Sequence, residues 1–270
     1  MNTNILHLGL VDDDDIVLDS AALDLAALDH PERDLDPFSV LLGEISERIA
    51  EIGGAAHDGP THAAALARVI GDEYGFVGDR ETYDDPANAD MIRVLERRRG
   101  LPVSLSILYV AAARRLGWSA AALDSPGHVL VRIGNETQPV LIDPFAGGAV
   151  VGAEALAALL AQSLGPGTAP AGRHVAAMSN RSVLVRLLLN QATRAEKAGQ
   201  TMRALTLFER MTVIAPGTGH PWWERARLEL AGGRVSAARS SLSAMLEMTR
   251  DPVRRGQIAS ALAALNTSER

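Results

Sequence analysis

The chain has 270 residues, a formal net charge of −7 and an apolar fraction of 47%. This length allows one large or two ordinary domains with buried cores, and the apolar fraction is typical of globular chains. The acidic charge argues against nucleic-acid binding, which needs a basic patch. The absence of cysteine excludes disulfides and thiolate metal sites. No apolar run approaches the ~20 residues of a membrane span, and the acidic start does not resemble a signal peptide, so we expect a soluble, cytoplasmic protein.

Residues 1–60 are predicted to form a helical segment that packs on the domain after it. Aspartates 12–15 precede an apolar pattern, as expected near a helix N-terminus. Pro31 and Pro37 then interrupt the chain before a second amphipathic helix. One face of that helix is predicted to carry the following apolar side chains: Val40, Leu41, Ile45 and Ile49.

Residues 61–165 are predicted to form one domain, which begins with short helices. A third helix is expected over Thr61–Tyr74, followed by a glycine-rich turn at 75–78. Asp90–Arg99 predicts a short helix that ends at Gly100, because glycine is favoured directly after a helix. Asn88 precedes this helix and is expected to cap it.

A buried helix and three strands complete this domain in the prediction. Pro102 suits the first turn of a helix, and the segment from about Val103 to Leu116 is apolar nearly all round, so it should be buried. Apolar runs then predict strands at the following positions: Ser119–Leu123, His128–Ile133 and Val140–Ile142. A helix followed by antiparallel strands indicates the α+β class.

The chain after residue 153 is predicted to be helical, with a Gly/Pro-rich linker at 166–179 and repeats over 180–270. The repeat aligns residues that lie 34 positions apart: Gly199 with Gly233, Ala204 with Ala238, Phe208 with Leu242, and Met211 with Met245. A 34-residue period predicts tetratricopeptide-like helical hairpins, with a last helix at Gln257–Leu265 as a cap. An ordinary helical bundle with chance spacing is the alternative.

Two side chains with catalytic potential lie on neighbouring predicted strands. His128 opens one strand, and Asp143 follows the next, fifteen residues later. A polar turn at 134–139 would make these strands antiparallel and bring the two side chains together. A carboxylate that orients an imidazole is one half of a nucleophilic triad. A purely structural hydrogen bond between the same two residues is the alternative.

Three stretches resemble the transglutaminase-like core of the bacterial SirB-type proteins, which falls within the papain-like superfamily: residues 83–109, 126–132 and 142–148. That family also has an acidic helical segment before the core and tetratricopeptide-like helices after it, so the resemblance covers nearly the whole chain. It implies that His128 and Asp143 match the histidine and aspartate of the superfamily. The superfamily cysteine begins the buried helix, where this chain has Pro102, Val103 and Ser104.

Two functions are compatible with these residues. The first is a non-catalytic or catalytically degraded core that acts in protein–protein interaction or regulation, binding a protein or peptide through its cleft and through the helical tail. The second is an acyl hydrolase or amidase in which Ser104 attacks, His128 takes its proton and Asp143 holds the imidazole. This second function requires an exposed Ser104 hydroxyl within hydrogen-bond reach of His128.

No cofactor or metal is predicted. His57 and His62 match no metal-ligand spacing, and no glycine loop of a phosphate-binding type is present. The oligomeric state is left open by the sequence.

Overall fold

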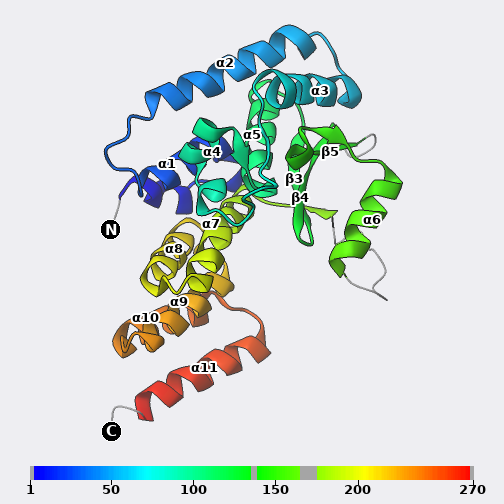
Figure 1. Ribbon diagram of the computed structural model, residues 1–270. Coiled ribbons are helices and arrows are strands. Elements are labelled where there is room, and N and C mark those ends of the chain that lie inside the picture. Colours follow the sequence, from blue (N-terminus) through cyan, green and yellow to red (C-terminus); the bar gives the residue numbers. More distant parts are fainter. Residues whose placement is uncertain (1–2, 135–138, 165–174, 268–270) are drawn as a thin grey trace. The chain divides into compact units, whose positions relative to one another are not determined.

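The computed structural model describes residues 3–134, 139–164 and 175–267 (Figure 1). They form two compact units, one of Asp12–Leu187 and one of Met1–Val11 with Leu188–Arg270. This division differs from the predicted boundaries, because the first eleven residues group with the tail and not with the core. The middle of the polar turn at 134–139 and most of the linker at 166–179 lie outside the described residues.

The unit Asp12–Leu187 is built on a five-stranded antiparallel sheet with the order β6-β5-β4-β3-β7. Its strands are the following: β3 (Ala120–Ser125), β4 (His128–Ile133), β5 (Val140–Asp143), β6 (Ala149–Val150) and β7 (Ala176–Ala177). The three central strands agree with the prediction, and the α+β fold class is confirmed. The edge strands β6 and β7 were missed because two residues are too few to show an alternating pattern.

Helix α5 (Pro102–Arg115) forms the centre of this unit, as its apolar sequence predicts. It lies against β3 and β4 on one face of the sheet (Figure 1). Every residue from Pro102 to Ala113 is buried. Pro102 is favoured here because the N–H that proline lacks has no partner in the first turn of a helix. Gly117, with φ +74°, turns the chain after the helix.

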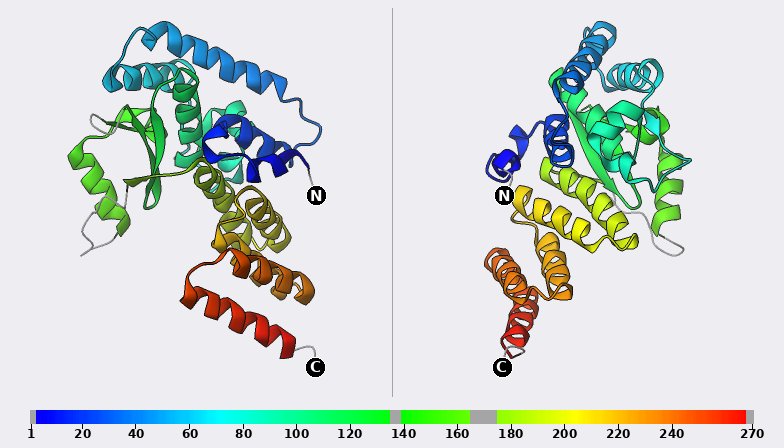
Figure 2. Two further views of the ribbon diagram at one scale, coloured as in Figure 1. Left: turned by 180° about the vertical axis from the view of Figure 1, so that it is seen from behind. Right: turned by 60° about the vertical axis from the view of Figure 1, so that its left-hand side comes forward.

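Three helices pack around α5: α1 (Leu18–Ala27), α2 (Asp36–Gly53) and α3 (Gly59–Leu66), of which α3 also contacts β4 and β5 (Figure 2). Helix α2 buries Leu42, Ile45 and Ile49. Val40 was predicted on that face but is 60% exposed. It lies two residues before Leu42, and two residues turn an α-helix by about 200°, which directs Val40 toward solvent.

The segment before α5 differs from the prediction in two ways. The glycine-rich turn at 75–78 contains strand β1 (Val77–Gly78), which pairs in parallel with β2 (Arg99–Gly100). Helix α4 (Met91–Arg97) ends because Arg98 adopts the left-handed conformation, with φ 56°, and not because of Gly100. Gly100 serves a packing purpose instead, since a Cβ there would lie 2.6 Å from the Ser104 hydroxyl.

The other unit consists mainly of a helical tail. Its helices are α7 (Asn180–Lys197), which starts in the first unit, α8 (Thr201–Ile214), α9 (Gly219–Ala231), α10 (Val235–Met248) and α11 (Pro252–Thr267). Residues 34 positions apart have matching environments: Gly199 and Gly233 both have φ +72°, and Ala204 and Ala238 are both fully buried. Their identity as tetratricopeptide repeats stays a prediction. None of the helices in the described ranges combines the length and hydropathy of a membrane span.

A carboxylate is buried inside this tail. Glu229 of α9 is 1% exposed. It accepts hydrogen bonds from Arg225 Nε at 3.0 Å and from the Ser241 hydroxyl of α10 at 2.7 Å. The side chain of Glu229 therefore links one helix of the hairpin to the other.

Candidate functional site

Strands β4 and β5 bring His128 and Asp143 together, as their spacing predicts. The His128 Nε2 atom lies 2.8 Å from Asp143 Oδ1. The antiparallel register places Val131 opposite Ile142, so the start of β4 lies beside the end of β5. The two side chains are 16% and 17% exposed, which leaves the pair in contact with solvent.

Neighbouring groups hold both members of this pair in place. Asp143 Oδ1 also accepts the backbone N–H of Phe145 at 2.9 Å, which fixes the carboxylate at the start of a short turn. The Phe145 ring packs edge to face with the His128 imidazole, with 5.9 Å between ring centres. Arg186 donates to the His128 carbonyl oxygen at 2.8 Å. The imidazole is therefore oriented by a carboxylate that is itself fixed by the backbone.

Close backbone contacts fix the loop after Asp143. A Cβ on Gly71 would lie 2.4 Å from the Gly147 carbonyl oxygen. A Cβ on Gly148, which has φ +85°, would lie 2.8 Å from the Ala67 Cα. The loop therefore packs directly on the π-helical segment Ala67–Glu73 that follows α3, with no room for side chains at these glycines.

The structure does not bring Ser104 to this pair. Ser104 is 0% exposed. Its hydroxyl accepts the Leu101 N–H at 2.8 Å and donates to the Asn88 carbonyl oxygen, also at 2.8 Å. The expectation of an exposed hydroxyl beside His128 is therefore wrong. The physical reason is position: Ser104 is the third residue of α5, where a hydroxyl can turn back to the N–H of the residue that precedes the helix, here Leu101.

The other two residues at the expected nucleophile position carry no reactive group. Pro102 and Val103 are buried in the first turn of α5. The start of this helix thus serves as part of the core, and its side chains present no nucleophile to the imidazole.

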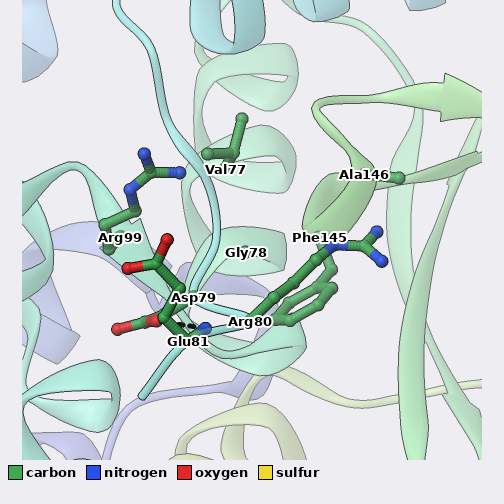
Figure 3. Close-up of a pocket in the computed structure, with 8 residues that line it drawn as sticks. All are labelled: Val77, Gly78, Asp79, Arg80, Glu81, Arg99, Phe145 and Ala146. Carbon is green, nitrogen blue, oxygen red and sulfur yellow. Dashed lines mark hydrogen bonds between the residues drawn. The ribbon is translucent and has the colours of Figure 1, made fainter. Parts of the chain in front are cut away.

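A pocket that the sequence did not reveal lies beside Phe145. Its volume is about 330 Å³ (Figure 3). The residues that line it are Val77, Gly78, Asp79, Arg80, Glu81, Arg99, Phe145 and Ala146. Strand β1, the three residues after it and Arg99 of β2 supply six of the eight lining residues, so the pocket depends on the β1–β2 pairing, where the sequence predicts a turn.

A buried network anchors one wall of the pocket. Asp79 is buried and accepts the Thr82 hydroxyl at 2.6 Å and Arg97 Nη2 at 2.9 Å. Arg97 also donates to the Asn88 side-chain oxygen at 3.1 Å. Asn88 therefore braces this loop, while Asp90 caps α4 by accepting the N–H of Arg93. The expectation that Asn88 caps this helix is wrong, because its amide is already engaged in the loop.

Hydrogen bonds stabilise the ionised form of Asp79. The Thr82 hydroxyl and the Thr82 backbone N–H are the main causes, and they lower the pKa of Asp79 to about 2. Because this pKa lies below the ordinary 3.8, ionised Asp79 stabilises the folded state above pH 4. That stabilisation is lost as the pH falls from about 4 to about 2, where the folded protein takes up the proton.

We therefore expect Asp79→Asn to reduce the free energy of unfolding more at about pH 6 than at about pH 2, with a difference of roughly 2 kcal/mol. Urea unfolding of wild type and variant at both pH values measures this difference. Asp34→Asn, which changes an exposed carboxyl, is the matched control. An equal effect of Asp79→Asn at the two pH values would contradict the linkage.

The histidines considered for metal binding have other surroundings. His62 stacks on Trp118 with 3.8 Å between ring centres, and its Nε2 lies 2.9 Å from the Ala56 carbonyl oxygen. Within the described ranges, no three His, Asp or Glu side chains gather closely enough to hold a metal ion.

Comparisons with known proteins add a family relationship to this geometry. Residues 38–189 match a family model described as the transglutaminase-like superfamily. A UPF0162 protein of Xylella fastidiosa (strain 9a5c) is 31% identical over 245 residues, which cover 89% of this chain and 87% of that protein. A UPF0162 protein of Vibrio cholerae is 28% identical over 207 residues, 75% of this chain and 76% of its own length.

A shorter similarity reaches beyond bacteria. F-box only protein 21 of Mus musculus is 36% identical over 81 residues, which are 30% of this chain and 13% of that protein. The segment matched by the family model contains His128, Asp143 and the whole lining of the pocket.

Proposed function

This chain belongs to the transglutaminase-like superfamily, and we propose that it uses its core to bind a polypeptide without transforming it. The observation that supports this proposal most strongly is the burial of Ser104, whose hydroxyl is bonded to backbone atoms at the start of α5. The chain has no cysteine that could replace it. Acyl transfer through an acyl-enzyme intermediate requires a nucleophilic side chain, and this helix start supplies none.

The pair of His128 and Asp143 then acts as part of a binding surface. Its imidazole is partly exposed, and the Asp143 carboxylate fixes its orientation. A fixed polar group beside an aromatic ring can hydrogen-bond a peptide group at little entropic cost. Phe145 provides that ring. The same constellation that orients an imidazole for catalysis thus suits recognition.

The helical tail offers a second surface for a protein partner. Trp223 and Met202 are exposed there, at 40% and 65%. A pocket of about 130 Å³ between α9, α10 and α11 includes Trp223 and Arg254 in its lining. Exposed aromatic and methionine side chains are enriched at protein interfaces, so the tail supports a role in interaction or regulation.

Peptide display on phage, panned against the full chain, tests the proposal. We expect enriched peptides that bind reversibly, are recovered with unchanged mass, and bind less tightly to Phe145→Ala than to wild type. Recovery of cleaved or covalently attached peptides would contradict the proposal of binding without catalysis and would indicate an enzymatic activity. Failure to enrich any peptide with the native protein would contradict the proposal as a whole.

A further inference from the structure

We infer that the pocket beside Phe145 binds an acidic peptide segment, with Arg80 and Arg99 as separate partners for its carboxylates. This inference rests on the proposed function, because it takes the ligand to be a peptide, and it adds the chemistry that selects this peptide. The pocket of about 330 Å³ is large enough for one acidic side chain and its neighbouring main chain.

The two arginines of the pocket are exposed. Within the part of the chain that the structure describes, no carboxylate pairs with Arg80 or Arg99. Arg97, two residues before Arg99, differs from them: its guanidinium donates hydrogen bonds to Asp79 and to Asn88. A guanidinium matches a carboxylate with two parallel N–H donors, so each of these arginines favours that ligand.

The backbone around Arg80 and Arg99 is held before any ligand arrives. The Arg80 guanidinium carbon lies 5.5 Å from the centre of the Phe145 ring, and Figure 3 shows the side chain extended along that ring. Asp79, directly before Arg80, is fixed by its bonds to Thr82 and Arg97. Arg99 belongs to β2, whose pairing with β1 fixes its backbone. Binding therefore requires little ordering of the backbone.

Glu81 restricts which anions fit. Its carboxylate belongs to the same pocket, so a bare anion meets repulsion on that side. A peptide reduces this repulsion, because a main-chain N–H next to its acidic side chain can donate a hydrogen bond to the Glu81 carboxylate. The net charge of −7 also repels anions at long range, so binding must come from the local guanidinium groups.

Fluorescence anisotropy with a labelled hexaglutamate peptide and the full chain tests this inference, with hexaglutamine as the uncharged probe. We expect binding of hexaglutamate only, weakened about tenfold by Arg80→Gln or Arg99→Gln and strengthened severalfold by Glu81→Gln. Arg234→Gln, at an exposed arginine of the tail, is the matched control and should leave the affinity unchanged. Added salt should weaken binding.

The outcomes separate this inference from the proposed function. If hexaglutamate binds with the same affinity to wild type, Arg80→Gln and Arg99→Gln, the assignment of this pocket as the binding site is wrong. No hexaglutamate binding, together with display-selected peptides that are neutral or basic, overturns the inference and leaves the binding function standing. Absence of binding by every peptide tested overturns both.

Discussion

Replacing Glu229 by alanine is expected to destabilise the helical tail by roughly 3 kcal/mol, the typical cost of breaking a buried ion pair. The carboxylate is buried and bonded to Arg225 and to the Ser241 hydroxyl. Its removal leaves a partly buried guanidinium without its closest partner and a buried hydroxyl without its acceptor. The Ser241 hydroxyl then bears a desolvation cost that water cannot relieve.

Urea unfolding followed by tryptophan fluorescence measures this effect well, because Trp222 and Trp223 lie on the same helix as Glu229. Glu247→Ala, at an exposed position of α10, is the control and should change stability by less than about 0.5 kcal/mol. Glu229→Gln should fall between the two, since it keeps an acceptor but loses the charge. Equal stabilities of Glu229→Ala and Glu247→Ala would show that the ion pair is not buried in solution.

A cysteine placed at position 104 is expected to react with an aromatic disulfide reagent about a thousandfold more slowly than an exposed cysteine. Because the natural chain has none, Ser104→Cys contains a single thiol and its reaction is unambiguous. The position is 0% exposed, so the reagent reaches it only when the start of α5 opens. A thiol at the position where cysteine enzymes have theirs would therefore still be unreactive in the folded protein.

Ser236→Cys, at an exposed position of the tail, supplies the reference rate. Urea at concentrations that unfold the protein should remove the difference between the two variants. Rapid modification of Ser104→Cys in the native protein, at a rate near that of the reference, would show that position 104 is accessible. It would then support the alternative of catalysis through a covalent intermediate at this position.

The sequence predicted the parts of the core that depend on local patterns. The buried helix at 102–115 followed from an apolar run that starts with proline and ends at glycine. The pairing of His128 with Asp143 followed from two adjacent strands and their register. In these cases neighbouring residues in the sequence carry the information, because helix ends and antiparallel pairs of consecutive strands are local structures.

What the sequence did not predict depends on contacts between distant segments. Strand β1 pairs with residues 99–100, more than twenty positions later, and two residues show no strand pattern. The direction of Ser104 was open, because a serine in a first turn can face either solvent or the preceding loop. Asn88, which meets it there, lies sixteen residues earlier. The pocket was missed for the same reason, since Arg80 follows β1 while Arg99 belongs to β2.

Three glycines limit what can be concluded about function from a related sequence. Gly71, Gly78 and Gly148 each lack the space for even one carbon atom, because a backbone or an aromatic ring fills it. Selection for folding alone therefore retains glycine at these positions, whatever happens to the chemistry nearby. A homologue that has these glycines next to the histidine–aspartate pair is therefore expected to fold this loop in the same way. Transferring an enzymatic activity between such homologues on the strength of these glycines would mistake a packing requirement for a catalytic one.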